Sequence, residues 1–337
     1  MKLVIGANGF LGSHVVRRLV ADGEQVRVLT RKTSDTRSID EIPAADGQIE
    51  RVTGDLFDRP SLDAALRGID DVFHCAVDTR AWLIDPAPLF RANVDGLRNV
   101  LDAAADAELR SFVFASTMGT IGRHDRVVDE TDEFNWGEVA TDYIKSRVAA
   151  ENLALGYARE GRVPVRAMCV SNTYGPYDWK PTNHGIFVKG PALGKFPFRT
   201  RGMATESVAI DDAALAMILA TSRGRDGERY IVSERFLDMR DLIETAATAA
   251  GHEPPRLILP RPAMYALGAG GSALAKVTGK PQLLNIDTVR LMHYMSPMSH
   301  AKAETELDWH PRPVLDAVAE AARFWVERRA TRRATRA

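Results

Sequence analysis

Cysteine is scarce in this sequence of 337 residues, which contains only Cys75 and Cys169. Each of them ends an apolar run of the kind that forms a strand. Two such positions do not make the disulfide framework of a secreted protein, and they favour a reducing compartment. We therefore expect a cytoplasmic protein in which both thiols pack in the core.

An excess of one charge is also absent, because 44 basic residues nearly balance 45 acidic ones and the formal net charge is -1. This balance gives no general attraction to nucleic acid or to a membrane. The longest weakly polar stretch, residues 263–275, is too short to span a bilayer and predicts a packed helix rich in glycine and alanine. The N-terminus, MKLVIGANGF, lacks the apolar region of a signal peptide. We expect a small-molecule partner, no nucleic acid and no membrane span, and the sequence leaves a homodimer open.

Short apolar runs alternate with helical patterns in the first half of the chain, which is typical of a doubly wound parallel sheet. The strand candidates are residues 2–5, 25–30, 49–53, 71–75, 111–116 and 163–170. Residues 10–22 carry apolar side chains on one helical face, and Gly23 is the expected helix stop. The predicted fold class is α/β, with a Rossmann sheet and a smaller C-terminal substrate-binding lobe.

Two lobes are expected for a chain of this length. We predict a dinucleotide-binding domain at residues 1–170 and a mainly substrate-binding lobe at 171–330, from which about 205–235 returns to the first domain. A segment rich in glycine, proline and aromatic residues opens the second lobe. The basic tail at 331–337 completes the run ERRATRRATRA, which we expect to be frayed and solvated.

A glycine-rich turn lies between the first predicted strand and its helix. Gly6, Gly9 and Gly12 in GANGFLG have the spacing GxxGxxG. At this position a tight turn lets backbone N–H groups and the helix N-terminus meet a pyrophosphate. The placement after the first strand predicts a dinucleotide site, since a glycine triplet alone is weak evidence.

The end of the second strand indicates which dinucleotide binds. Enzymes that use NAD place an acidic side chain there, whereas this chain has Arg31 and Lys32, which suit a 2′-phosphate. We therefore favour NADP(H) over NAD(H). The alternative is that both cations are solvated and Asp35 reaches back to the ribose. Asp55, after the third strand, is a candidate partner of the adenine amine or a local turn former.

A catalytic helix is identifiable by resemblance. The segment DYIKSRVAAE at 142–151, with Ala115-Ser116-Thr117, Asn93-Val-Asp-Gly, NTYGP at 172–176 and LDWHP at 307–311, resembles the extended short-chain dehydrogenase/reductases, the NAD(P)-dependent epimerase/dehydratase family. The similarity covers almost the whole chain. Dihydroflavonol-reductase-like and hopanoid-associated sugar-epimerase-like branches look most similar.

The resemblance implies a catalytic set of Tyr143 as the acid/base, Thr117 as its orienting hydroxyl, and Arg147 at the position of the family lysine. Lys145 cannot replace that lysine, because a residue two positions from Tyr143 points elsewhere on a helix. A cation about 4 Å away, at an effective dielectric of about 20, contributes roughly 4 kcal/mol, which bounds the lowering of a phenol pKa at about three units. Arginine supplies that charge but not a proton.

The remaining site residues also follow from the resemblance. The implied cofactor contacts are Gly6, Asn8, Gly9, Phe10, Leu11, Gly12, Arg31, Lys32, Asp55, Leu56, Cys75, Ala76, Ser116, Tyr143, Arg147, Val170 and Asn172. The candidate substrate contacts are Trp82, Met118, Tyr174 and His184, although aromatic residues in these loops could equally belong to the core. Val170 stands where the family usually has proline, and Ala209 where it often has histidine. No metal site is expected, because His74 has no second ligand at metal-binding spacing.

These features give three functional hypotheses. The first is an NADPH-dependent reductase, or the reverse dehydrogenase, for a hydrophobic ketone, aldehyde or secondary alcohol. The second is a nucleotide-sugar epimerase or dehydratase that reduces and reoxidises a tightly held cofactor within one turnover. The third is a non-catalytic NADP(H)-binding sensor or scaffold, for which the arginine at position 147 is the discriminating feature.

Overall fold

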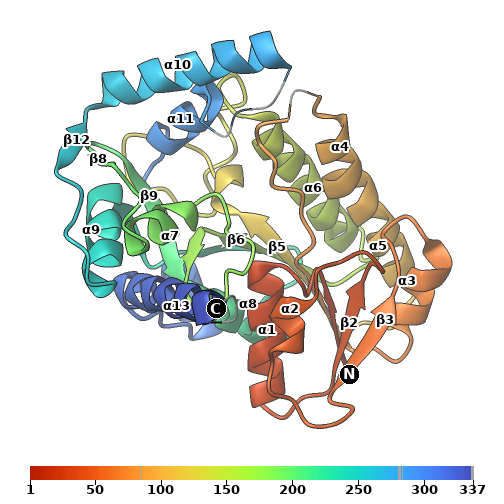
Figure 1. Ribbon diagram of the computed structural model, residues 1–337. Helices are drawn as coiled ribbons and strands as arrows, with labels where there is room; N and C mark the ends of the chain where they lie inside the picture. Colours follow the sequence, from red (N-terminus) through yellow and green to blue (C-terminus); the bar gives the residue numbers. More distant parts are fainter. Residues whose placement is uncertain (84, 280–281, 283, 335–337) are drawn as a thin grey trace.

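A seven-stranded parallel sheet forms the centre of the computed structural model, which describes residues 1–83, 85–279, 282 and 284–334. Its strands are β1 (Lys2–Ile5), β2 (Val26–Thr30), β3 (Ile49–Thr53), β4 (Asp71–His74), β5 (Ser111–Thr117), β6 (Val165–Val170) and β10 (Arg229–Val232). They are arranged in the order β10-β6-β5-β4-β1-β2-β3 (Figure 1). The α/β fold class and all six predicted strands are confirmed, with ends that shift by at most two residues.

Helices cover both faces of this sheet. One face carries α1 (Phe10–Ala21) and α8 (Ile210–Arg223), and the other carries α3 (Arg59–Leu66), α5 (Gly96–Ala105) and α6 (Asp142–Arg159). The apolar stripe of α1 explains its position, because Val15, Val16, Leu19 and Val20 are all buried against the sheet. The predicted helix at 10–22 is confirmed, and Gly23 follows it with a φ of 81°.

The second lobe packs around its own apolar core, which includes Leu242, Ile243, Val318 and Trp325. Its sheets have the strand orders β11-β9-β7 and β12-β8. Its strands are β7 (Asn172–Tyr174), β8 (Phe198–Thr200), β9 (Ala204–Ala209), β11 (Arg235–Asp238) and β12 (Leu257–Leu259). Its helices are α7 (Ile186–Ala192), α9 (Met239–Ala249), α10 (Arg261–Thr278), α11 (Ile286–His293) and α13 (Val314–Ala334). The shorter helices α2 (Arg37–Asp40), α4 (Ala87–Phe90) and α12 (Ala301–Leu307) connect larger elements.

Two expectations about the packing are wrong. The helix at 263–275 is not packed on all sides: α10 lies along the surface, and of its residues only Met264 and Gly268 are buried. The basic tail is not frayed from residue 327, because α13 continues to Ala334 and the Arg328 guanidinium lies 4.2 Å from the centre of the Trp179 ring. Residues 335–337 lie outside the described part. Cys169 is buried as expected, and Cys75 is partly buried and packs against the core of the central sheet.

Two further features of the structure concern membrane spans and metal sites. Of the helices described, none is long and apolar enough to cross a membrane. Within the same described residues, no three histidine, cysteine, aspartate or glutamate side chains are placed to hold a metal ion.

Candidate active site

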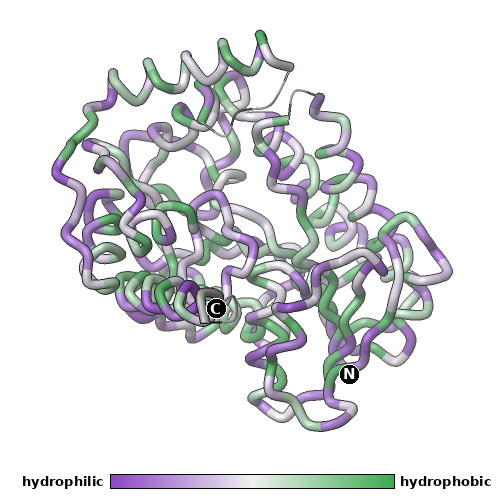
Figure 2. The backbone as a smooth tube through the Cα atoms, viewed as in Figure 1, coloured by the Kyte–Doolittle hydropathy of each residue, from purple (hydrophilic) through white to green (hydrophobic). Residues whose placement is uncertain are grey.

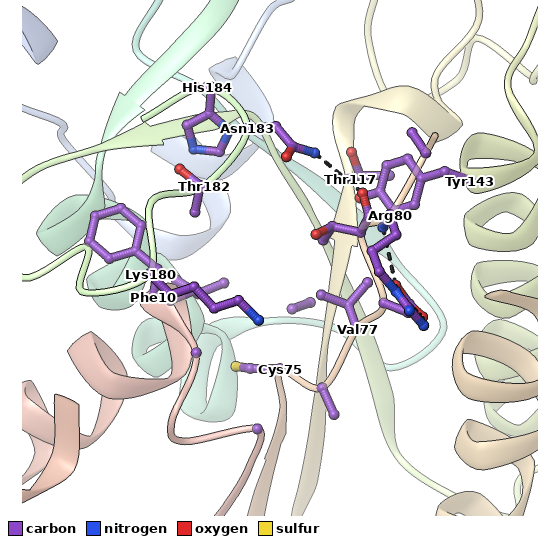
Figure 3. A pocket seen from close by; sticks show the side chains of 18 of the residues that line it. Phe10, Cys75, Val77, Arg80, Thr117, Tyr143, Lys180, Thr182, Asn183 and His184 are labelled. Atoms are coloured by element: carbon purple, nitrogen blue, oxygen red, sulfur yellow. Dashed lines mark hydrogen bonds and ion pairs between the residues drawn. The ribbon is translucent and has the colours of Figure 1, made fainter. Parts of the chain in front are cut away.

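A large cleft runs between the two lobes at the carboxyl ends of the central strands and encloses about 2050 Å³. Every residue that the sequence predicts for the site lines it, with the exception of Lys32. Figure 3 shows Phe10, Thr182 and His184 on one side of the cleft and Thr117 and Tyr143, adjacent to each other, on the other. The fold therefore brings together side chains that are distant in the sequence.

The glycine turn of the cleft has no space for side chains. A Cβ atom on Gly6 would lie 2.5 Å from the Ala76 backbone nitrogen, and one on Gly12 would lie 2.3 Å from the Gly6 carbonyl oxygen. Gly6 also has a φ of 83°, which only glycine adopts without strain. The Gly9 N–H donates to the Gly6 carbonyl at 3.0 Å and closes the turn in front of α1. This bare backbone fits the pyrophosphate of a dinucleotide.

The end of β2 carries the residues that would meet the adenosine ribose. Arg31 lines the cleft, whereas Lys32 is exposed outside it. Asp35 is engaged by Arg37, and this hydrogen-bonded pair lowers the pKa of the Asp35 carboxyl to about 2. Asp55 serves at least as a turn former, because its Oδ1 accepts from the Phe57 N–H at 3.0 Å.

Two catalytic candidates come from neighbouring elements. Thr117 ends β5, and Tyr143 lies in the first turn of α6, which Thr141 caps by accepting from the Ile144 N–H. Burial raises the pKa of the Tyr143 phenol, although the positive charge of Arg147 and hydrogen bonding from Thr117 both lower it. The expected lowering of this pKa is therefore outweighed by desolvation. A phenol whose pKa is raised stays protonated at neutral pH.

Arg147 lies one turn after Tyr143 on the same side of α6 and is only 1% exposed. Its Nη2 donates to the Ala115 carbonyl of β5, and its guanidinium carbon lies 4.9 Å from the centre of the Phe114 ring. Within the described residues, its Nη1 is buried without a hydrogen-bond partner. A buried cation with an unused donor fits an oxygen of a ligand in the cleft, because such donors are rarely left unsatisfied.

Glu151 is a buried residue that the sequence reasoning did not single out. Its carboxylate accepts hydrogen bonds from Ser116 and from Thr120, the latter at 2.9 Å, and lies 3.3 Å from the Arg229 guanidinium. These contacts fix the end of β5 beside Thr117. The available signal was the spacing: positions 143, 147 and 151 are four apart and share one helix face.

Asn93 connects the catalytic helix to the loop after β4. It lies in a π-helical turn at Arg91–Asp95, where its side chain donates to the Asp78 carbonyl and to the Ser146 hydroxyl, both at 3.0 Å. The Asp78 carboxylate in turn pairs with Arg80 inside the cleft (Figure 3). The motif around Asn93 was noticed in the sequence, but this connecting role was not.

The part of the cleft that holds the predicted substrate contacts, called the substrate half from here on, is mostly apolar. The predicted residues Trp82, Met118, Tyr174 and His184 all line it. They are joined by apolar side chains that the sequence did not predict: Phe187, Phe196, Phe198, Met203, Met239, Met264 and Met295. The lining therefore favours a ligand with substantial apolar surface.

Two ionisable groups in this half are changed by burial. Desolvation lowers the pKa of His184 to about 4 and raises that of Asp178 to about 6. One Asp178 oxygen accepts from the Thr182 N–H at 2.8 Å, while the other is buried and has no partner in the part of the chain that the structure describes. Asn183 reaches across the cleft, and its side-chain amide donates to the Thr79 carbonyl at 3.3 Å (Figure 3). Both lobes therefore contribute to one site.

Comparisons with known proteins agree with this architecture. The profile of the NAD dependent epimerase/dehydratase family matches residues 2–233. Sterol demethylase protein B of Methylococcus capsulatus is 28% identical over 97% of this chain and 98% of its own length. A putative dihydroflavonol 4-reductase of Synechocystis is 26% identical over 96% of this chain and 93% of its own. The crystal structure of gox2253 superimposes with a TM-score of 0.84 at 33% identity, over 97% of this chain and 98% of that one. The chain thus belongs to the NAD dependent epimerase/dehydratase family and is an NAD(P)-dependent enzyme of the extended short-chain dehydrogenase/reductase type.

Proposed function

We propose that this enzyme reduces an apolar ketone or aldehyde with NADPH, or oxidises the matching secondary alcohol, with Tyr143 as the proton donor or acceptor. The observation that carries the proposal is the continuity of the cleft, because Tyr143 lines the same cavity as the glycine turn and the apolar residues of the substrate half. The relatives named as a reductase and a sterol-processing protein support the same class of chemistry.

The part of the cleft around the glycine turn and Arg147, called the cofactor half from here on, fits a nicotinamide dinucleotide. The turn at Gly6 and Gly12 would hold its pyrophosphate, and the unused donor of Arg147 would bind a ribose oxygen. Bound nicotinamide supplies the hydride in reduction and accepts it in oxidation.

The chain's own residues manage the proton. In reduction the Tyr143 hydroxyl donates its proton to the oxygen of the substrate carbonyl, and the oxygen becomes the hydroxyl of the alcohol. In oxidation the phenolate takes that proton back. The Thr117 hydroxyl orients the substrate oxygen, and the Arg147 charge stabilises the phenolate without exchanging a proton. Thr117→Ala should therefore lower turnover by about 10- to 1000-fold, less than loss of the phenol.

The cofactor preference rests on Arg31, which lines the cleft and suits a 2′-phosphate; Asp35 also lines the cleft, and its carboxylate is paired with Arg37. Binding calorimetry should show tighter binding of NADPH than of NADH. Arg31→Asp should move the preference toward NADH, while Lys32→Asp, outside the cleft, should move it less. Equal affinities in the unchanged protein would contradict the proposal.

An epimerase or dehydratase is the second candidate, and the observation in its favour is that Lys180 lines the cleft together with Arg80, which is paired with Asp78. Such side chains suit the diphosphate of a nucleotide sugar. The two candidates differ in cofactor balance. Steady consumption of NADPH with apolar carbonyl compounds supports the reductase. Copurified cofactor, together with turnover of a nucleotide sugar and no net NADPH consumption, would support the second candidate instead.

A further inference from the structure

The loop that follows β4 brings a carboxylate into the part of the cleft that holds the catalytic tyrosine. Asp78 and Tyr143 line the same cavity, and the Asp78 side chain is only 12% exposed. Figure 3 shows Arg80, the ion-pair partner of Asp78, on the same side of the cleft as Tyr143 and Thr117. Burial and the negative charge of Asp78 raise the pKa of the Tyr143 phenol, whereas Arg147 and Thr117 lower it. Tyr143 is therefore subject to two opposed charges.

A chain of buried hydrogen bonds fixes Asp78 to the turn of α6 that carries Tyr143. The Asn93 Oδ1 accepts from the Asp78 N–H at 2.8 Å, and its Nδ2 donates to the Asp78 carbonyl at 3.0 Å. The same Nδ2 donates to the Ser146 hydroxyl at 3.0 Å, and this hydroxyl donates to the Tyr143 carbonyl at 2.7 Å. Asn93 is 1% exposed and Ser146 is fully buried. Because breaking such bonds leaves buried groups unsatisfied, residue 78 keeps its place relative to Tyr143.

The Asp78 carboxylate keeps its charge. Its Oδ1 accepts from the Arg80 Nε at 2.9 Å and from the Arg80 backbone N–H at 3.1 Å. Lys180, from the second lobe, points its amino group into the cleft (Figure 3). Burial raises the pKa of Asp78, but the Arg80 hydrogen bonds and the charges of Arg80 and Lys180 outweigh it, so that this pKa is lowered. The carboxylate is therefore ionised throughout the range in which a phenol titrates.

The other elements around Tyr143 add no competing charge within the described residues. On the same turn of α6, Asp142 and Lys145 lie 3.8 Å apart and pair with each other, and both are about half exposed. The strand β5 contributes Thr117, and along this strand the tube of Figure 2 has none of the purple that marks charged residues. Arg147 and Asp78 are therefore the two charges that set the protonation of Tyr143.

We propose that Asp78 is a positioning residue that acts through Tyr143: its negative charge opposes that of Arg147 and holds Tyr143 in the protonated form. The use of that proton in reduction rests on the proposed function, whereas the effect of the charge does not require catalysis. Arg147 alone would favour the phenolate, which is the form that oxidation needs. Asp78 thus sets the site for proton donation at neutral pH and delays oxidation to higher pH.

Titration of the phenol tests this charge effect without catalysis. The ultraviolet absorbance of phenolate is measured in the full-length protein near pH 10, and the difference from the same protein carrying Tyr143→Phe isolates the Tyr143 signal. Asp78→Asn should raise the ratio of phenolate to phenol at Tyr143 by about threefold to tenfold, which corresponds to a pKa lower by about 0.5–1 unit. Asparagine keeps the size of the side chain and an oxygen for Arg80, and circular dichroism checks the fold.

Two variants control for the charge and for its position. Asp78→Glu keeps the negative charge and should have a phenolate ratio like that of the parent. Asp85→Asn removes a carboxylate that also lines the cleft but accepts from the Ala87 N–H at 3.0 Å and does not act on Tyr143. This variant should also resemble the parent.

The pH dependence of oxidation separates this proposal from the proposed function. In Asp78→Asn, oxidation should reach half its maximal rate about 0.5–1 pH unit below the parent, opposite to the shift expected for Arg147→Met. An unchanged phenolate ratio in Asp78→Asn, or an equal rise in Asp85→Asn, would overturn the proposal. A raised ratio in a protein without NADPH-dependent turnover would leave the role of Asp78 standing and contradict only the reductase activity.

Discussion

In the cofactor half of the cleft, the backbone of the glycine turn forms the surface, whereas in the substrate half side chains from β8, α7, α9 and α10 form it. Added atoms collide with backbone in the first half, at 2.5 Å or less for Gly6 and Gly12. Methionine and phenylalanine side chains line the second half, and methionine in particular adapts to ligands of different shape. The cofactor half is therefore suited to one cofactor, whereas amino-acid substitutions in the substrate half can change which substrate the cleft accepts.

The largest effect is expected in the cofactor half. Gly12→Val should weaken NADPH binding by about 100-fold or more, because its Cβ would overlap the Gly6 carbonyl and displace the turn. Gly156→Val is the control, since a Cβ at this glycine of α6 meets nothing within 4 Å. Calorimetry with NADPH measures both variants. Similar affinities in the two would show that the close packing of the turn does not control cofactor binding.

Arg147 lies where the two halves meet. Arg147→Met removes a cation that lowers the pKa of Tyr143, so the pH at which oxidation reaches half its maximal rate should rise, and NADPH affinity should fall with it. Arg147→Lys keeps the charge and should keep or raise activity. The pH dependence of oxidation and the NADPH affinity are measured for both variants. An unchanged profile and affinity in Arg147→Met would make Arg147 a packing residue only.

Asp178 tests the substrate half through stability. Its folded-state pKa of about 6 lies above the ordinary value, so the native protein binds the proton more tightly than the unfolded chain does. The contribution of this bound proton to the free energy of unfolding is fully present below about pH 4 and is lost as the pH rises through 6. Asp178→Asn should therefore raise the free energy of unfolding by about 1–3 kcal/mol at pH 8 and much less at pH 4. Urea unfolding at the two pH values provides the check, and a pH-independent change would contradict the assigned cause.

The smallest effect is expected from a single apolar contact. Met239→Ala should raise the KM for an apolar substrate by about tenfold or less and leave NADPH affinity unchanged, because Met239 is only one of many side chains that line the substrate half. Parallel measurement of both constants separates the halves of the cleft. A matching loss of NADPH affinity would mean that the two halves are not independent.

The positions of the glycine turn and of Arg31 could be predicted from the sequence because their determinants are local. The strand at 2–5, the three glycines and the helix that begins at Phe10 follow one another along the chain, and the parallel sheet fixes where they point. Arg31 follows the next strand by the same logic. Tyr143, Arg147 and Thr117 were predicted only through the family resemblance, because nothing local to α6 says that it borders β5.

The substrate half could not be predicted to the same extent, because its residues come from segments without a motif. Phe196, Met239 and Met264 are ordinary apolar residues until α9 and α10 place them around one cavity. The exposed face of α10 was misjudged as packed for the same reason, since a glycine- and alanine-rich helix can be buried on every side or on one. The sequence around Asp178 likewise does not indicate that this side chain is buried.

The most direct test of the central claim is single-turnover reduction by Tyr143→Phe with saturating NADPH. The account predicts a loss of about 100- to 10,000-fold in the reduction rate with NADPH affinity nearly unchanged, because only the transferred proton is removed. Tyr157→Phe is the matched control on the same helix; its hydroxyl donates to Asp102 at 2.6 Å and it is absent from the cleft lining. Normal reduction by Tyr143→Phe would contradict the assignment of Tyr143 as the proton donor.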